Sequence, residues 1–291
     1  MPELPEVEIT RRHIEPLLVG RRIADVVTGS PSYFFITPPD ELRKRLRGAT
    51  VKQLERRGKY IVGDVDTGDS LLLHLGMTGQ LFGSGAKSVR LLSSTARASL
   101  APETQVDFEP DTHTHLRFRF EDDGPEVFFR DVRKFGKVML TAQDEPNARL
   151  DRLGRDALTV TGEHLFEATR KRKTPIKAVL LDQSVIAGCG NIYADEALFY
   201  AGVRPGRRAA RVTRKECEAI ARELLRVLTR SIETGGSSIS DYVAPDGSDG
   251  QYQDERRVYA RTGEPCLVCE SEIRRKLVAQ RGTHYCPQCQ S

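Results

Sequence analysis

The C-terminal end of the chain carries two pairs of closely spaced cysteines. Cys266 and Cys269 form the first Cys-x-x-Cys pair. Cys286 and Cys289 form the second, and sixteen residues separate the two pairs. Zinc prefers four thiolate ligands in a tetrahedron, and each Cys-x-x-Cys turn supplies two of them. Two disulfides are the alternative in an oxidising compartment. The spacing predicts a zinc ribbon with one structural zinc, because four cysteine ligands leave no open position for catalysis.

Basic residues lie between the two cysteine pairs. Residues 273–283 are typical of a hairpin with arginine and lysine near its tip, which suits phosphate binding. The whole chain is mildly basic, with a net charge of +4. Arginine and lysine also cluster at residues 43–59, 170–177, 204–215 and 274–281. A solvated face is the alternative for any single cluster, but together they indicate a nucleic-acid partner.

Length and composition exclude several classes of protein. The chain has 291 residues, enough for two domains, with 38% hydrophobic and 30% charged residues. This is neither a disordered nor a membrane composition, and no apolar run approaches the roughly twenty residues of a membrane span. The acidic N-terminus lacks the apolar region of a secretory signal, so we expect a cytoplasmic protein. The isolated Cys189 and Cys217 are then expected to be buried thiols.

The first half of the chain has the pattern of a β-sandwich preceded by a helix. Helical spacing of apolar residues predicts a helix over residues 5–18. Short β-rich stretches separated by turn residues follow at 22–28, 50–66, 70–75, 115–121, 127–129 and 137–140. Residues 84–114 are rich in Ser, Ala and Thr without a clean period, and we interpret them as an insertion between strands.

The second half has a helical pattern. Helices are predicted at residues 162–172, 175–183, 191–202 and 214–234. Thr213 and Glu216 have the spacing of a capping box at the start of the last of these helices. Residues 235–253 are rich in Gly, Ser and Asp and predict a loop before the ribbon.

The N-terminus offers a reactive amine. Met1 precedes the small residue Pro2, so we expect its removal, which would leave a secondary amine beside Glu3. An α-amine has a pKa near 7.7–8, so roughly a tenth is unprotonated at neutral pH, against less than about one in a thousand for lysine. Such a secondary amine can attack a sugar aldehyde and form a charged iminium, which is a good electron sink. The alternative is an ordinary helix start, where Pro and Glu are favoured.

Five motifs span the chain in order: MPELPEVE at 1–8, HLGMTG at 74–79, DVRKFG at 131–136, GCGNIYADEAL at 188–198 and AQRGTHYCPQC at 279–289. Together they resemble the bacterial formamidopyrimidine-DNA glycosylase family. The resemblance implies catalytic roles for Pro2 as nucleophile and Glu3 as general acid and base. It also implies that Lys59 and Arg281 bind phosphate at the active site, and that Glu6 lies near the lesion sugar.

The resemblance further implies a set of DNA-binding residues. Met77, Arg133 and Phe135 match a trio that fills the space left by a flipped base, with Arg133 facing the orphan cytosine. His74 and Asn191 match positions that contact phosphate, and Lys177 matches a lysine linked to recognition of oxidised guanine. Without the resemblance, Met77 and Phe135 would be interpreted as core residues and His74 as a structural histidine. Asn191 would be a helix N-cap, Lys59 a lysine on a strand surface and Arg281 a solvated arginine.

Two features depart from the family pattern. The insertion at 84–114 is longer than the usual connection, and Ser240 stands where relatives often have a lysine. Ser240 lies in the predicted lesion-recognition loop, residues 235–253. These departures bear on which lesion is preferred and leave the chemistry unchanged.

The resemblance implies an α+β multidomain protein. We expect a β-sandwich catalytic domain at 1–145, a helix-two-turn-helix domain at 151–250 and a zinc ribbon at 257–291, with DNA between the two halves. The implied protein is a monomeric, nucleoid-associated bacterial enzyme of base excision repair that acts on double-stranded DNA. As a DNA glycosylase it excises 8-oxoguanine and formamidopyrimidines through a proline Schiff base. As an abasic-site lyase it then cuts the strand by β- and δ-elimination. No nucleotide cofactor is implied.

Two other functions compete with this expectation. Endonuclease VIII shares the proline chemistry but removes oxidised pyrimidines; the ELPEVE start and the Met77, Arg133 and Phe135 trio favour the purine branch. A catalytically silent DNA-binding zinc protein is the other alternative. The presence of Pro2, Glu3 and Lys59 argues against it.

Overall fold

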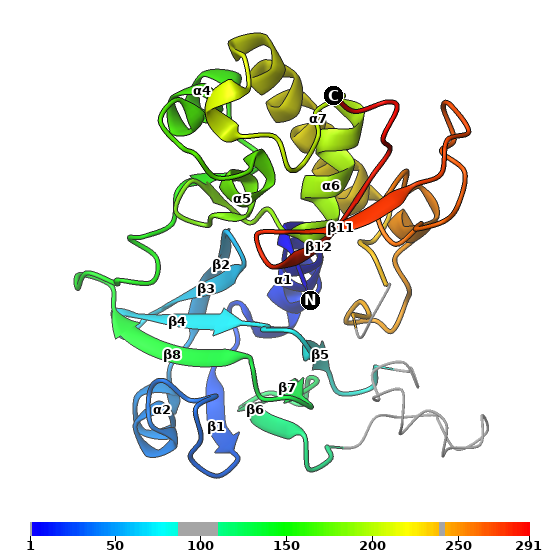
Figure 1. The fold of residues 1–291 in the computed structure, drawn as a ribbon. Coiled ribbons are helices and arrows are strands. Elements are labelled where there is room, and N and C mark those ends of the chain that lie inside the picture. Colours follow the sequence, from blue (N-terminus) through cyan, green and yellow to red (C-terminus); the bar gives the residue numbers. More distant parts are fainter. Residues whose placement is uncertain (1, 87–109, 239–241) are drawn as a thin grey trace, which may run out of the picture. The chain divides into compact units, whose positions relative to one another are not determined.

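The chain forms two compact units, each built from two separate stretches (Figure 1). The computed structural model describes residues 2–86, 110–238 and 242–291. The N-terminal unit comprises Met1–Ala148 and Thr234–Gln251, and the C-terminal unit comprises Arg149–Glu233 and Tyr252–Ser291. The segment that was predicted as a loop at 235–253 therefore belongs almost entirely to the N-terminal unit. The predicted three-domain division stays a prediction.

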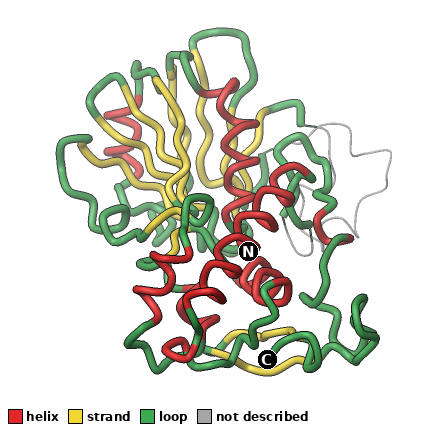
Figure 2. Tube along the Cα trace, turned by 90° about the horizontal axis from the view of Figure 1, so that it is seen from above, coloured by secondary structure: helices red, strands yellow, loops and turns green. Residues whose placement is uncertain are grey.

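The N-terminal unit is a sandwich of two four-stranded antiparallel sheets, ordered β2-β3-β4-β8 and β1-β6-β7-β5. The elements are α1 (Leu4–Leu18), β1 (Ile23–Thr28), α2 (Pro39–Leu46), β2 (Val51–Arg57), β3 (Tyr60–Val65), β4 (Asp69–His74), β5 (Gly79–Gly83), β6 (Thr114–Phe120), β7 (Val127–Asp131) and β8 (Lys137–Ala142). Inward-facing residues of both sheets share one hydrophobic core. Helix α1 lies along the strands (Figure 2) and contacts β2, β3 and β5. The sandwich and its leading helix were both predicted.

Three details of this unit differ from the predicted elements. The β-rich stretch at 50–66 is a hairpin, β2 and β3, that turns at Gly58 and Lys59. Strand β5 was not predicted because all five of its residues are buried, so they show no alternation. Helix α2 was not predicted either, since it begins at a Pro-Pro pair, with Pro38 as its N-cap and Pro39 as its first residue. Proline is tolerated at the first helical position, and acidic residues in the first turn with basic residues in the last stabilise α2.

Most of the predicted insertion lies outside the described residues, which leave out 87–109. At its two ends, Ser84 begins a turn after β5, and Thr114 is already the first residue of β6. Ser240 also lies outside the described residues.

The C-terminal unit is helical and ends in a two-stranded hairpin. Its elements are β9 (Arg155–Asp156), α4 (Gly162–Thr169), α5 (Ile176–Leu181), β10 (Ile186–Ala187), α6 (Asn191–Tyr200), η3 (Ala209–Arg211), α7 (Arg214–Glu233), η4 (Tyr252–Asp254), β11 (Arg274–Val278) and β12 (Arg281–Tyr285). The predicted capping box is present, because Thr213 N–H donates to Glu216 at 2.8 Å and Glu216 N–H donates to Thr213 Oγ1 at 3.3 Å. Strands β11 and β12 form the predicted hairpin between the cysteine pairs.

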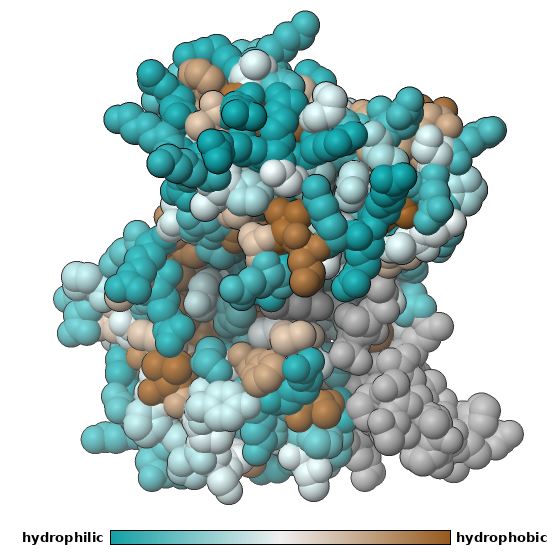
Figure 3. All heavy atoms as spheres, in the orientation of Figure 1, coloured by the Kyte–Doolittle hydropathy of each residue, from teal (hydrophilic) through white to brown (hydrophobic). Residues whose placement is uncertain are grey.

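The visible surface is mainly hydrophilic, with small separate hydrophobic groups (Figure 3). Within the described ranges, no helix has both the length and the apolar character needed to cross a membrane.

Candidate functional site

The start of α1 buries a proline and two carboxylates side by side. Pro2 is buried, and Glu3 and Glu6 are each only 2% exposed. Glu3 is the N-cap of the helix, and its backbone N–H donates to Glu6 Oε2 at 2.8 Å. The reciprocal bond from the Glu6 backbone to the Glu3 side chain completes a capping box. This fixes Glu3 immediately next to Pro2 at the positive end of the helix.

Glu6 also binds the segment that follows α7. Its Oε1 accepts a hydrogen bond of 3.0 Å from the backbone N–H of Ser237. Gly236 has a φ of +85°, and a Cβ atom there would lie 3.2 Å from Glu6 Oε1, so a side chain would disturb this approach. Tyr242 is buried nearby, and burial together with the charge of Glu6 raises the pKa of its phenol. Residues from the two ends of the N-terminal unit thus meet at one carboxylate.

Lys59 lies in the two-residue turn between β2 and β3 and is half-buried. Arg56 ties this turn to α1. Its guanidinium donates to Gly58 O at 3.1 Å, and its Nε lies 3.3 Å from Glu8 Oε2. Burial would raise the pKa of Glu8, but hydrogen bonds from two arginines of its own helix and the charge of Arg56 together lower it. Glu8 is therefore charged, and its ion pair with Arg56 anchors the turn that carries Lys59.

His74 ends strand β4 and has a defined tautomer. The backbone N–H of Gly76 donates to His74 Nδ1 at 3.1 Å, so a neutral ring carries its proton on Nε2. The ring centroids of His74 and Tyr60 lie 4.8 Å apart. The donor for a phosphate at this position would be Nε2.

Met77, Arg133 and Phe135 are exposed and lie on two loops that touch. The Arg133 guanidinium carbon lies 4.7 Å from the centre of the Phe135 ring. A Cβ atom on Gly76 would lie 2.4 Å from the backbone carbon of Phe135, so only glycine allows this approach of the two loops. Met77 and Phe135 are thus not core residues, although side chains of their type usually are.

A buried carboxylate, Asp131, organises both loops. Asp131 Oδ2 accepts a hydrogen bond of 2.6 Å from Gly136 N–H, and Oδ1 accepts one of 3.3 Å from Arg133 N–H. The hydroxyl of Thr78, next to Met77, also donates to Oδ1. Asp131 is fully buried, so these bonds are shielded from water and fix the loop of residues 131–136.

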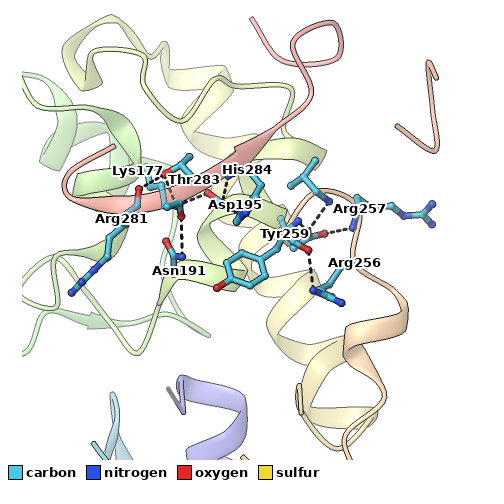
Figure 4. Close-up of polar contacts among 12 residues, drawn as sticks. Lys177, Asn191, Asp195, Arg256, Arg257, Tyr259, Arg281, Thr283 and His284 are labelled. Carbon is cyan, nitrogen blue, oxygen red and sulfur yellow. Dashed lines mark hydrogen bonds and ion pairs between the residues drawn. The ribbon is translucent and has the colours of Figure 1, made fainter. Parts of the chain in front are cut away.

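Asn191 is the first residue of α6 and Arg281 the first residue of β12, and these two elements of the C-terminal unit are in contact. Asn191 follows Gly190, and its Nδ2 donates to Gly282 O at 3.1 Å. Gly282 follows Arg281, whose side chain is exposed and points away from this contact (Figure 4). The start of α6 and the first residues of β12 are therefore held together by one hydrogen bond.

Lys177 is buried in this same unit. Its ammonium lies 2.7 Å from Asp195 Oδ1 and donates to Thr283 Oγ1 at 2.8 Å (Figure 4). Lys177 and Asp195 are both completely inaccessible. The predicted contact of Lys177 with an oxidised guanine stays a prediction, and in this structure its charge is neutralised by Asp195.

Glu196, the next residue of α6, accepts three backbone hydrogen bonds. The donors are the N–H groups of Arg257, Val258 and Tyr259, at 2.8, 2.9 and 2.8 Å. Burial raises the pKa of this carboxyl, although the three N–H groups oppose that effect. Glu196 thereby fixes the segment that leads into the zinc ribbon.

The four C-terminal cysteines form a metal site of the expected geometry. Their Sγ atoms all lie within 4.8 Å of one another, with Cys266–Cys289 at 3.8 Å and Cys269–Cys286 at 3.4 Å. A tetrahedral zinc with bonds of about 2.3 Å requires sulfur–sulfur distances of about 3.8 Å. The donor set and its size fit one zinc ion, which would join the two knuckles at the base of β11 and β12.

Three family models match almost the whole chain. The "Formamidopyrimidine-DNA glycosylase N-terminal domain" matches residues 1–138 and the "Formamidopyrimidine-DNA glycosylase H2TH domain" matches residues 153–243. The "Zinc finger found in FPG and IleRS" matches residues 263–291. The chain belongs to the formamidopyrimidine-DNA glycosylase family. The match confirms the expected fold class of a β-sandwich, a helix-two-turn-helix domain and a zinc finger.

Relatives of known sequence and relatives of known structure support the assignment to this family. The formamidopyrimidine-DNA glycosylases of Thioalkalivibrio sulfidiphilus and Geobacillus kaustophilus are 40% and 41% identical to this chain, and each alignment covers all of both proteins. The crystal structure of MutM (Fpg) from Thermus thermophilus is 35% identical, with a TM-score of 0.83 over 99% of this chain and 98% of its own. Lactococcus lactis Fpg in complex with DNA containing an abasic site is 32% identical, with a TM-score of 0.85 over 99% of each chain.

Within each unit, several predicted site residues of the formamidopyrimidine-DNA glycosylase family are neighbours. The start of α1 gathers the proposed nucleophile and its carboxylates, and the two touching loops gather the predicted trio. Asp131 and Glu196 were missed as supporting residues. Both lie inside the recognised motifs DVRKFG and GCGNIYADEAL, which are the signal that could have found them.

Proposed function

We propose that the chain is a bifunctional DNA glycosylase and abasic-site lyase that removes oxidised purines from double-stranded DNA. The start of α1, where the buried Pro2 is followed by the buried and hydrogen-bonded Glu3 and Glu6, is the observation that carries the proposal. Solved relatives support it, since a mutant of Lactococcus lactis Fpg has been crystallised with DNA containing Fapy-dG, and Lactococcus lactis Fpg with DNA containing an abasic site. In a bacterial cell, DNA binding would hold the protein at the nucleoid.

The proposed chemistry begins when Met1 is removed and Pro2 becomes a free secondary amine. The amine attacks C1′ of the damaged nucleoside, and the electron pair of the glycosidic bond leaves with the base, which takes up a proton. Ring opening of the sugar gives an iminium, which acidifies the C2′ proton. Glu3 is next to the amine and is the proposed group that moves these protons. Loss of the 3′-phosphate and then of the 5′-phosphate completes β- and δ-elimination.

The remaining predicted residues are proposed to hold the DNA. Lys59 and Arg281 would bind phosphates near the reacting sugar, with His74 and Asn191 as neutral donors. An enzyme that reaches C1′ must extrude the nucleotide, which leaves a gap in the stack. Exposed apolar side chains fill such gaps, and this supports the proposed role for the loops that carry Met77 and Phe135. Arg133 would donate to the base opposite the lesion.

The zinc ion, when bound, would hold the two knuckles of the ribbon together and takes no part in the reaction, because four thiolates close its coordination. The ribbon residues position Arg281. They do so through the hairpin, whose second strand, β12, contacts α6 at Gly282.

Borohydride trapping tests the proposed function. If Pro2 is the nucleophile, reduction during turnover on an 8-oxoguanine duplex gives a stable protein–DNA adduct, and mass spectrometry places it on residue 2. A preparation that retains Met1 gives no adduct but still binds DNA. Glu3→Gln slows excision of the intact base more than cleavage of a pre-formed abasic site, where no base has to leave. An adduct on a lysine of the unmutated protein would contradict the proposal, and faster cleavage of thymine glycol than of 8-oxoguanine would favour endonuclease VIII.

A further inference from the structure

The exposed large hydrophobic residues of the N-terminal unit gather on three connected loops. Within the part of this unit that the structure describes, they are Tyr33, Ile36, Met77 and Phe135. Met77 and Phe135 belong to the two touching loops. Tyr33 and Ile36 come from the connection between β1 and α2, a segment to which no role has been assigned above. This third loop is bonded to strand β8, which directly follows the loop of residues 131–136, because Ile36 N–H donates to the backbone carbonyl of Val138 at 2.8 Å.

Tyr33 reaches the loop that carries Arg133. Its hydroxyl donates to the backbone carbonyl of Arg133 at 2.8 Å, across one hundred residues of sequence. The ammonium of Lys137 lies 4.6 Å from the centre of the Tyr33 ring and donates to Gly136 O at 3.0 Å. Tyr33 itself is 56% exposed, so its position is explained by these contacts and not by core packing.

Both backbone polar groups of Arg133, its N–H and its carbonyl, therefore have hydrogen-bond partners. Its N–H donates to Thr78 Oγ1 at 3.2 Å and to Asp131, while its carbonyl accepts from Tyr33. The residue that follows, Lys134, has a φ of +57°, in the left-handed region that side chains other than glycine avoid. Rotation of the peptide between Arg133 and Lys134 would relieve this conformation, and the same rotation would turn the Arg133 carbonyl away from Tyr33.

We propose that Tyr33 is a positioning residue that holds the Arg133–Lys134 peptide in its strained orientation and so aims Arg133 at the base opposite the lesion. The inference rests on the proposed role of Arg133. Base readout requires a side chain placed to within a fraction of an ångström, and the direction of a side chain follows from its backbone. Loss of the hydroxyl would let the peptide rotate, and discrimination between opposite bases would fall.

The test compares cleavage of 8-oxoguanine opposite cytosine and opposite adenine, as a ratio of kcat/KM values. Tyr33→Phe removes the hydroxyl but keeps the ring over Lys137. In this variant the ratio of kcat/KM opposite cytosine to kcat/KM opposite adenine should fall about three- to tenfold, which corresponds to the net free energy of one hydrogen bond. Borohydride trapping on a pre-formed abasic site should be unchanged. Ile36→Ala, an exposed residue of the same loop, serves as the matched control and should leave the ratio unaltered.

A second substitution separates positioning from a general loss of structure. Glycine adopts positive φ without strain, so Lys134→Gly should restore the ratio in the Tyr33→Phe background, while any loss of phosphate attraction affects both duplexes alike. An unchanged ratio in Tyr33→Phe, with a lowered ratio in Arg133→Ala, overturns the inference and leaves the role of Arg133 standing. An unchanged ratio in Arg133→Ala shows that the proposed role of Arg133 itself is wrong.

Discussion

The ammonium of Lys177 lies 2.7 Å from the carboxylate of Asp195, and no part of either side chain reaches solvent. Asp195 also accepts the backbone N–H of His284 at 2.9 Å. The ion pair joins α5 to α6. Hydrogen bonds from Lys177 to Thr283 and from His284 to Asp195 join both helices to β12. A buried pair of this kind is costly to break, since the charge that remains has no water to solvate it.

We therefore expect Lys177→Met to destabilise the C-terminal unit by about 3–5 kcal/mol, because it leaves Asp195 charged and buried. Denaturant unfolding would measure the loss. The double variant Lys177→Met with Asp195→Asn removes both charges, keeps an acceptor for His284 and should regain most of the stability. If 8-oxoguanine cleavage returns with stability, Lys177 acts through the fold. If the stable double variant stays selectively defective on that lesion, direct recognition by Lys177 is supported.

The ribbon is predicted to contain one zinc ion per chain. Cys286→Ser should release the metal and weaken DNA binding, while the N-terminal unit stays folded, because metal binding at such sites supplies the folding energy of the ribbon. Metal analysis and circular dichroism would check both parts. Cys217→Ser is the matched control, since Cys217 is equally buried but lies outside the cysteine cluster. Protein purified without chelator that holds no zinc would contradict the prediction.

Phosphate binding by the exposed Arg281 predicts a defined salt response. Arg281→Ala should weaken DNA binding and reduce the slope of log affinity against log salt by about one, as expected for one lost phosphate contact. Asn191→Ala should weaken binding with little change in slope, because the side chain is uncharged. Titrations at several salt concentrations give both values. Unaltered affinity and slope for Arg281→Ala would remove the proposed role of the hairpin.

A pH-dependent contribution to stability is expected from Asp111 and Arg130, whose side chains lie 2.7 Å apart. Burial would raise the pKa of Asp111, but hydrogen bonding and the charge of buried Arg130 outweigh it and lower that pKa. A lowered pKa gives stability that is present above the unfolded value of about 3.9 and is lost as pH falls through the folded value. Asp111→Asn should cost about 1–3 kcal/mol at pH 7, discounted because Asp111 is partly exposed.

Urea unfolding at several pH values, followed by circular dichroism because the chain has no tryptophan, checks this expectation. The gap between Asp111→Asn and the unmutated protein should begin to narrow as pH falls below about 4 and should close only below the lowered folded pKa of Asp111. Asp122→Asn, which alters the surface pair with Arg21, is the control and should have a smaller effect. A gap that persists at low pH would mean that the charge of Asp111 is not the cause.

Features with a local spacing could be predicted from the sequence, and features made by distant contacts could not. The cysteine pairs, the capping box at Thr213 and the first helix each follow from residues a few positions apart. Tyr33 acts through a bond to Arg133, one hundred residues away, and nothing in its own neighbourhood indicates that partner. Asp131 binds Arg133 and Gly136 within its own motif, but its bond to Thr78 is made only by the fold. Strand β5 was missed for a related reason, since burial on both faces removes the alternation that identifies a strand.

The same difference holds for the site residues. The motifs predicted which side chains belong to the site, but not which of them are buried. The sequence predicts a lesion contact for Lys177, and only the fold shows that its side chain is buried in an ion pair with Asp195. Met77 and Phe135 look like core residues, and only the close approach at Gly76 shows why their loops meet while both side chains stay exposed.

The bond between Glu6 and Ser237 has a consequence for the order of events during protein synthesis. Glu6 is among the first residues to leave the ribosome, and its partner is made 231 positions later. Domains usually fold as they emerge, but the N-terminal unit lacks its last segment, Thr234–Gln251, until most of the C-terminal unit has been made. A nascent chain that can already form both sheets still lacks the segment that completes the proposed reaction centre. Shortened chains released by stalled ribosomes would therefore fold a sandwich without acquiring a finished centre around Glu6.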